Sequence, residues 1–239
     1  MSASVLDRLK HRDPAIVLQA LGELLACREE ITDHAIIFGL VDQLSRRETG
    51  LRVLAASVLD ENTIPVNDLL PHLARALNDE HPEVRTKILR YYQKIDPNQQ
   101  LRNFLIPLLY DLDIVVRINA AKALWKHTRD SLVIEIPIVT GLQSHNTRCV
   151  NEACQLISDM ETSGAVYLSR LEILLGHKDA NIRGNALYAI SRITDDRASL
   201  QKNIDLLKND SDPMIHFIIS RLQKQDQSRT MTENEDIVN

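Results

Sequence analysis

The chain has 239 residues, of which 44% are hydrophobic and 26% are charged, and it contains seven glycines and eight prolines. These values are ordinary for a folded globular chain and exclude the fibrous and low-complexity classes. Its 28 basic and 33 acidic residues give a net charge of −5. A chain of this charge has no general attraction to nucleic acid or to anionic lipid.

The cysteines and the N-terminus bear on location. Cys27, Cys149 and Cys154 have neither the CxxC spacing of zinc sites nor the density of a disulfide framework, which favours a reducing cytoplasm. The first ten residues carry charges before any apolar run, and no stretch approaches the ~20 apolar residues of a membrane span. We therefore expect a cytoplasmic chain without an export signal or membrane anchor.

The strongest pattern is an internal repeat of about 33 residues. An apolar anchor residue recurs seven times, at spacings of 35, 33, 32, 33, 33 and 33 residues. Leucine stands seven residues before every anchor except the last, and alanine or isoleucine stands four residues after each one. Three such columns in register indicate seven structural units. The anchors are Ile16, Leu51, Val84, Val116, Cys149, Ile182 and Ile215.

Each unit predicts a helical hairpin. Apolar residues at the anchor, four residues later and eight residues later form the stripe of an amphipathic second helix, and an apolar segment upstream forms the first helix. Second helices are expected to begin near residues 13, 48, 81, 113, 146, 179 and 212 in chain order. The first turns contain proline at Pro14, Pro82 and Pro213, and aspartates able to cap them stand at Asp13, Asp113, Asp179 and Asp212.

Stacked hairpins of this kind share one elongated core, since no single hairpin buries its own apolar face. The predicted fold is therefore all-α, an α-solenoid of about seven stacked hairpins over residues 1–225 without a sharp domain boundary. Residues 226–239 are polar and acidic without periodicity, so we expect a disordered tail.

Two copies carry a family resemblance. Residues 77–85 read LNDEHPEVR and residues 110–124 read YDLDIVVRINAAKAL. The pattern resembles the HEAT repeat, specifically its bacterial branch named after phycobilisome lyases. The resemblance implies a ladder of aspartates and arginines between neighbouring repeats, here carried by Arg52, Arg85, Arg117 and Arg183. Val150 stands in the arginine column of repeat five, where the ladder is expected to be interrupted.

The exposed face of the second helices carries the candidate site. Lysines, arginines and one tryptophan gather there in the third and fourth repeats, and the sixth repeat adds a tyrosine and an arginine. In HEAT arrays this face is the concave one. The candidate partner-binding residues are Lys87, Arg90, Lys94, Lys122, Trp125, Lys126, Arg129, Tyr188 and Arg192.

Two interpretations of this basic patch remain open, a solvated helix surface and a docking site for an acidic partner. Trp125 is either an interface anchor or a core residue. Acidic residues are expected to flank the patch and confine a ligand to its centre; these are Asp60, Glu61, Glu152 and Asp159.

Chemical motifs are not evident. Cys149 and Cys154 lie near His145, but their i+5 spacing separates their directions by ~140° on a helix, so we expect core thiols rather than zinc ligands. The sequence has no glycine-rich phosphate loop and no G-x-S-x-G elbow. No catalytic residue, cofactor or metal site is expected.

These observations favour a non-enzymatic interaction module that binds a protein or extended peptide on its concave face. The family resemblance implies an alternative, a phycobilin lyase-like enzyme subunit or a chromophore chaperone. HEAT-like DNA binding or DNA repair is a third reading. A single tryptophan and the net charge of −5 count against nucleic acid.

Overall fold

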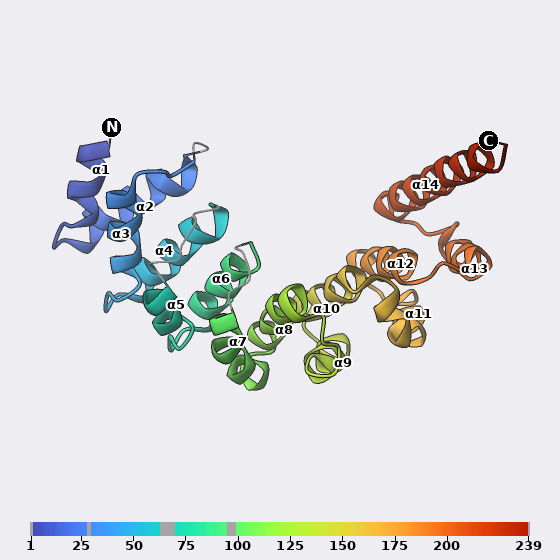
Figure 1. Cartoon of the computed structure of the whole chain (residues 1–239), viewed down its shortest axis with the longest axis horizontal. Coiled ribbons are helices and arrows are strands. Elements are labelled where there is room, and N and C mark those ends of the chain that lie inside the picture. The colour runs from blue at the N-terminus through green and yellow to red at the C-terminus, as the bar shows by residue number, and fades with distance from the viewer. Residues whose placement is uncertain (1, 28–29, 63–69, 95–98, 239) are drawn as a thin grey trace. The chain divides into compact units, whose positions relative to one another are not determined.

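The computed structural model describes residues 2–27, 30–62, 70–94 and 99–238. Every regular element in this part of the chain is a helix, and the helices pair into seven hairpins, as an α-solenoid requires (Figure 1). Residue contacts divide the chain into two compact units, Met1–Asp130 and Ser131–Asn239. The predicted fold class is confirmed, whereas the single elongated core over residues 1–225 stays a prediction.

The first unit holds four hairpins. Its second helices pack in succession, α2 on α4, α4 on α6 and α6 on α8, while first helices such as α5 and α7 lie along one side of this row (Figure 1). The pairs are α1 (Ser2–Leu9) with α2 (Pro14–Ala26), α3 (His34–Gln43) with α4 (Thr49–Glu61), α5 (Leu70–Ala76) with α6 (Pro82–Tyr92), and α7 (Gln99–Leu105) and η2 (Ile106–Tyr110) with α8 (Ile114–Thr128).

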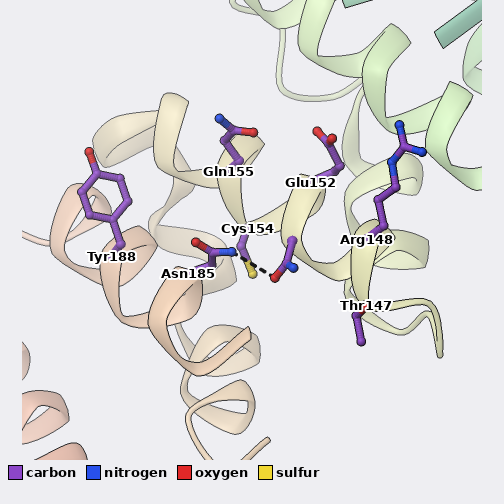
Figure 2. Close-up of a pocket in the computed structure, with 8 residues that line it drawn as sticks. Thr147, Arg148, Glu152, Cys154, Gln155, Asn185 and Tyr188 are labelled. Carbon is purple, nitrogen blue, oxygen red and sulfur yellow. Dashed lines mark hydrogen bonds between the residues drawn. The ribbon is translucent and has the colours of Figure 1, made fainter. Parts of the chain in front are cut away.

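The second unit holds three hairpins and repeats the scheme, with α12 packed between α10 and α14. An amide hydrogen bond links α10 to α12, in which Asn185 Nδ2 donates to Asn151 Oδ1 at 3.0 Å (Figure 2). The pairs are α9 (Glu135–Leu142) with α10 (Thr147–Asp159), η3 (Glu161–Tyr167) and α11 (Leu168–Leu174) with α12 (Ala180–Ile193), and α13 (Arg197–Leu207) with α14 (Pro213–Val238).

The second helices begin where the turn residues predict. Proline is the first residue of α2, α6 and α14, where the missing N–H costs no hydrogen bond. The four predicted aspartate caps also form, and each carboxylate accepts a backbone N–H two residues later at 2.7–2.9 Å. These caps belong to Asp13, Asp113, Asp179 and Asp212.

The apolar columns form the core. Six of the seven anchors are buried, and Ile16 at the N-terminal end is half-buried. All seven residues four positions after an anchor are buried, since this column faces the neighbouring second helix. Close approach explains its small side chains, and Gly184 in α12 shows the same constraint: a Cβ atom there would lie 2.7 Å from Ile218 Cδ1 of α14.

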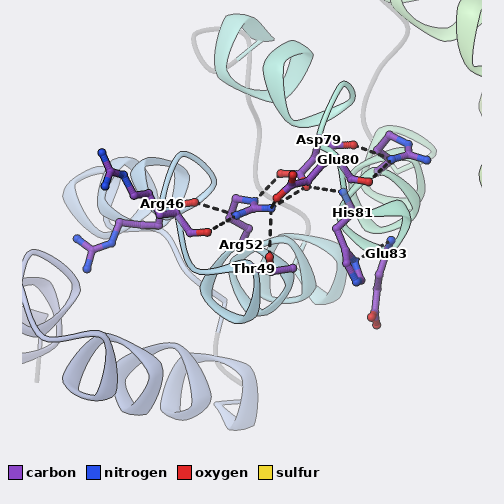
Figure 3. Close-up of polar contacts among 9 residues, drawn as sticks. Arg46, Thr49, Arg52, Asp79, Glu80, His81 and Glu83 are labelled. Carbon is purple, nitrogen blue, oxygen red and sulfur yellow. Dashed lines mark hydrogen bonds and ion pairs between the residues drawn. The ribbon is translucent and has the colours of Figure 1, made fainter.

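Arginine side chains connect successive turns (Figure 3). Arg52 Nε and Nη2 donate to the Asp79 carboxylate of the next repeat at 2.7 and 3.2 Å, and its Nη1 donates to the carbonyls of Arg46 and Arg47. Asp79 also accepts the N–H of His81. One guanidinium therefore fixes both its own turn and the turn that follows.

Two further arginine–aspartate pairs between successive turns have the same geometry, and we call each of the three pairs a rung. Arg85 pairs with Asp111, and Arg183 pairs with Asp210, each with a shortest N–O distance of 2.7 Å. Arg117 donates to the carbonyls of its own turn, at Asp111 and Leu112.

The sequence supplies no rung at repeat five. Ser144 stands where the other rungs have aspartate, and buried Val150 occupies the arginine column. The division between the two units, after Asp130, falls next to this repeat.

The last helix extends beyond the predicted end of the array. Helix α14 runs to Val238 and therefore includes most of the segment, residues 226–239, for which the sequence predicts disorder. The described side chains end at Gln225, so the absence of a docking face on the tail stays a prediction.

We expect Ala120→Leu to lower the free energy of unfolding by about 1–3 kcal/mol, because Ala120 is fully buried between second helices and a larger side chain overpacks that contact. Thermal and urea denaturation followed by circular dichroism would measure the change. Ala198→Leu, on the exposed surface of α13, is the matched control. Equal stability of the two variants would contradict the assigned core.

The Arg183–Asp210 rung predicts a stability that depends on pH. The hydrogen bond from Arg183 is the main cause that lowers the pKa of Asp210 below its ordinary value. The ionised carboxylate therefore stabilises the fold above its unfolded pKa of ~3.9, and this contribution is lost as pH falls through the lower folded pKa. Asp210→Asn should lower the melting temperature at pH 7, and the difference from wild type should shrink towards pH 2.5. A difference that stays constant with pH would exclude this ionic contribution.

Candidate functional site

Three of the predicted site residues converge on one buried carboxylate in the first unit. Lys87 Nζ and Arg90 Nε lie 3.3 Å from Asp60 Oδ2, and Lys94 Nζ lies 3.3 Å from Asp60 Oδ1. The Asp60 side chain is 0% exposed, whereas the side chains of Lys87, Arg90 and Lys94 are 19%, 41% and 38% exposed. Asp60 therefore lies beneath three cations that reach the surface, and we call these four residues the Asp60 cluster.

Repeat stacking produces this arrangement. Asp60 stands nine residues after the anchor of α4, and the three cations stand three, six and ten residues after the anchor of the next repeat. The following pair of repeats uses the same positions: Gln93 Nε2 donates to the backbone carbonyl of Asn119 at 3.2 Å, and Lys126 Nζ donates to the backbone carbonyl of Gln93. In both pairs of repeats, the ninth position after the anchor thus meets the next second helix.

The expected acidic flank is therefore wrong for Asp60. The sequence places it beside the basic patch, but the structure places it under the patch, at the contact between α4 and α6. Glu61, the next residue, is exposed as expected. The repeat alignment contained the signal, because the ninth column also holds Gln93, which donates to the next second helix, and the buried Trp125.

Two residues of the predicted patch are not on the surface. Trp125 is 4% exposed, so core packing is the correct reading and it is not an exposed interface anchor. Lys122 is 8% exposed and does not lie on a solvated face. Helix α8 packs on α6 and against α7 and η2 of its own repeat, so it buries more of its surface than a single apolar stripe indicates.

The other cations of repeat four lie at the C-terminal end of α8. Lys126 is exposed and bonds to Gln93, as described above. Arg129 is exposed, has a left-handed backbone conformation with φ 54°, and places its guanidinium carbon 5.3 Å from the centre of the Trp125 ring. This cation–π contact makes Arg129 partly a cover for the tryptophan.

The predicted residues of repeat six belong to the second unit and are separate from the Asp60 cluster. Arg192 is exposed and forms an ion pair with Glu161 at 2.9 Å. Tyr188 is 47% exposed and lies at one end of a groove of about 470 Å³ between α10 and α12 (Figure 2). The groove is lined by Thr147, Arg148, Asn151, Glu152, Cys154, Gln155, Asn185 and Tyr188.

The thiols in this unit are core groups. Cys149 and Cys154 are buried, as the sequence predicts, and burial raises the pKa of the Cys154 thiol to about 12. A thiol protonated at neutral pH is a poor nucleophile and a poor metal ligand. Among the residues that the structure describes, no group of three or more histidine, cysteine, aspartate or glutamate side chains is placed to hold a metal ion.

None of the described helices is long and apolar enough to span a lipid bilayer.

Comparison with known proteins identifies the fold and no family. No family model matches the sequence, and no curated protein matches it. Solved structures that resemble it include an engineered protein with a TM-score of 0.55 at 18% identity, covering 80% of this chain and 97% of that one. A designed armadillo repeat protein in complex with the peptide (KR)4 has a TM-score of 0.53 at 18% identity, covering 80% and 98%. Likeness at this identity supports a helical-repeat fold.

We expect Asp60→Asn to lower the free energy of unfolding by about 1–3 kcal/mol, because it leaves three neighbouring cations without their shared carboxylate. The cost should stay below that of breaking a fully buried pair, since water reaches the cations. Glu61→Gln makes the same chemical change at the adjacent exposed residue and should stay within about 0.5 kcal/mol of wild type. Urea denaturation would measure both, and equal effects would contradict a structural role for Asp60.

Proposed function

We propose that this chain is a non-enzymatic scaffold that binds an acidic segment of a partner protein or peptide on the second-helix face of its first unit. The Asp60 cluster carries this proposal, because one buried carboxylate holds three cations together at the surface of α4 and α6. The three cations exceed the single carboxylate by two positive charges. A negatively charged segment would complete the neutralisation.

Asp60 also reduces the cost of binding. Free lysine and arginine side chains lose rotamer entropy when a ligand immobilises them. In the cluster, the ion pairs with Asp60 already restrict Lys87, Arg90 and Lys94 before a partner arrives. Exposed Lys126, on the next second helix, can extend the positive surface towards α8.

Likeness to peptide-binding repeat proteins supports the class of function. One designed armadillo repeat protein of similar fold was solved with the peptide (KR)4, which is strongly basic. A protein of helical-repeat fold can therefore bind a peptide. In the present chain the clustered surface charges are positive, which favours a partner of opposite sign.

We also infer that the chain belongs to the HEAT family, in its phycobilisome-lyase-like branch, that the binding face is the concave one and that the protein is cytoplasmic. The repeat columns and the three arginine–aspartate rungs support the family assignment. The odd number of cysteines without metal-site spacing supports the location.

A direct test uses a fluorescein-labelled peptide of alternating glutamate and glycine and a matched peptide with glutamine in place of glutamate. We expect the acidic peptide to bind wild type at least tenfold more tightly in fluorescence anisotropy, with affinity falling as salt rises. Arg90→Glu combined with Lys94→Glu should abolish this binding, because the surface excess of positive charge changes sign.

A variant with the same change in net charge controls for general electrostatics. Lys178→Glu combined with Lys202→Glu alters two exposed lysines of the second unit and should retain binding. Circular dichroism would establish that both double variants fold. Equal binding by the two variants, or tighter binding of duplex DNA than of the acidic peptide, would refute the proposed site.

A further inference from the structure

The Asp60 cluster differs from the other ion pairs of the molecule in its geometry. The arginine–aspartate rungs have a shortest N–O distance of 2.7 Å and use two guanidinium nitrogens on one carboxylate. In the cluster, the N–O distance of each ion pair is 3.3 Å, and the Arg90 contact is formed by Nε. Short, two-pronged contacts are the strong ones, so these cations are held less tightly than the rungs.

The buried carboxylate is itself not saturated. Asp60 Oδ1 is buried and accepts no hydrogen bond, because the contact with Lys94 at 3.3 Å is an ion pair without hydrogen-bond geometry. A rigid structural ion pair would satisfy both oxygens. The Asp60 carboxylate therefore positions the three cations but does not use all of their hydrogen-bond donors.

The unused donors are those that a tetrahedral oxyanion requires. Among the described residues, Asp60 is the ion-pair partner of the Arg90 side chain, and no hydrogen bond uses the two terminal guanidinium nitrogens. Within the described part of the chain, Lys87 and Lys94 each form one ion pair, with Asp60, from an ammonium group that has three donors. A carboxylate has two oxygens to accept these donors, whereas a phosphoryl group has three.

The charge leads to the same ligand. Three cations above one aspartate leave an excess of two positive charges. A carboxylate would neutralise one of them, whereas a phosphate monoester, which carries −1.5 to −2 charges at pH 7, would neutralise nearly both. Guanidinium also matches the geometry of phosphate oxygens in a two-pronged contact.

We propose that the Asp60 cluster binds a phosphorylated serine or threonine side chain on an extended segment of the partner. This inference rests on the proposed function and specifies the group that the site recognises. Arg90 donates hydrogen bonds to two phosphoryl oxygens, and Lys94 and Lys87 contact the third. Asp60 positions the three cations without contacting the ligand.

A single phosphoryl group fits better than a polyanion. Lys87 and Arg90 belong to α6 and Lys94 to the turn directly after it, and exposed Glu61 and Glu83 stand at the end of α4 and the start of α6. A nucleic acid strand needs a row of cations along its backbone. The net charge of −5 opposes such a strand over the rest of the chain.

The test compares four labelled peptides of one neutral sequence that differ at the centre, which carries serine, phosphoserine, glutamate or two adjacent glutamates. Binding to the full-length protein is measured by fluorescence anisotropy at pH 7.5. We expect phosphoserine to bind at least tenfold more tightly than serine, and several-fold more tightly than the peptide with two glutamates, which has a similar charge spread over two groups.

Variants locate the contact. Arg90→Lys keeps the charge but removes the two-pronged donor, and it should remove most of the preference for phosphoserine over two glutamates. Arg90→Gln should weaken phosphoserine binding at least tenfold, whereas Lys202→Gln, at an exposed lysine of the second unit, should leave it unchanged. Circular dichroism melts verify that each variant is folded.

The outcomes separate this inference from the proposed function. Equal binding of phosphoserine and glutamate peptides would overturn the assignment to a phosphoryl group. It would still support the proposal that the chain binds an acidic segment of a partner. No binding of any anionic peptide would refute both. Inorganic phosphate or duplex DNA that binds as tightly as the phosphoserine peptide would overturn the assignment to a phosphorylated segment. An effect of Lys202→Gln equal to that of Arg90→Gln would overturn the assignment to this cluster.

Discussion

The structure depends on one constraint: a helical hairpin of this length cannot bury its own apolar face, so within each unit the second helices pack against one another in succession. The columns of small and aliphatic residues satisfy this constraint, since the seven residues four positions after each anchor are buried. Arginine–aspartate rungs then fix the turns that set the spacing between hairpins. Repeat five has Ser144 and Val150 in place of the aspartate and arginine of a rung, and the division between the two units falls next to it.

The same constraint creates the candidate site. Packing one second helix on the next brings the ninth position after an anchor under the third, sixth and tenth positions of the following repeat. Most repeats place neutral residues at that ninth position, such as Gln93 and Ser158. The second repeat places Asp60 there, and the third repeat supplies three cations above it. A positive surface is thus assembled by a stacking rule that otherwise serves stability.

Distance distinguishes the two kinds of ion pair in this chain. The rungs combine contacts of 2.7 Å with hydrogen bonds to backbone carbonyls, so their donors and acceptors are nearly all used in holding the turns. The Asp60 cluster has contacts of 3.3 Å, a carboxylate oxygen without a hydrogen bond and partly exposed cations. Buried ion pairs add little net stability when their geometry is loose, because desolvation offsets attraction. The cluster is therefore better suited to binding than to stabilising the fold.

The sequence by itself determined the repeat, its period, the helix starts at Pro14 and Pro82, and the core columns, because these depend on local turn chemistry and on helical periodicity. It also identified Lys87, Arg90 and Lys94 as neighbours. Only the tertiary structure decided that Asp60 lies beneath them and that Lys122 and Trp125 are buried. A helical wheel assigns one buried stripe to each helix, whereas α8 packs against α6, α7 and η2, and which side chains meet across those contacts depends on how the helices pack.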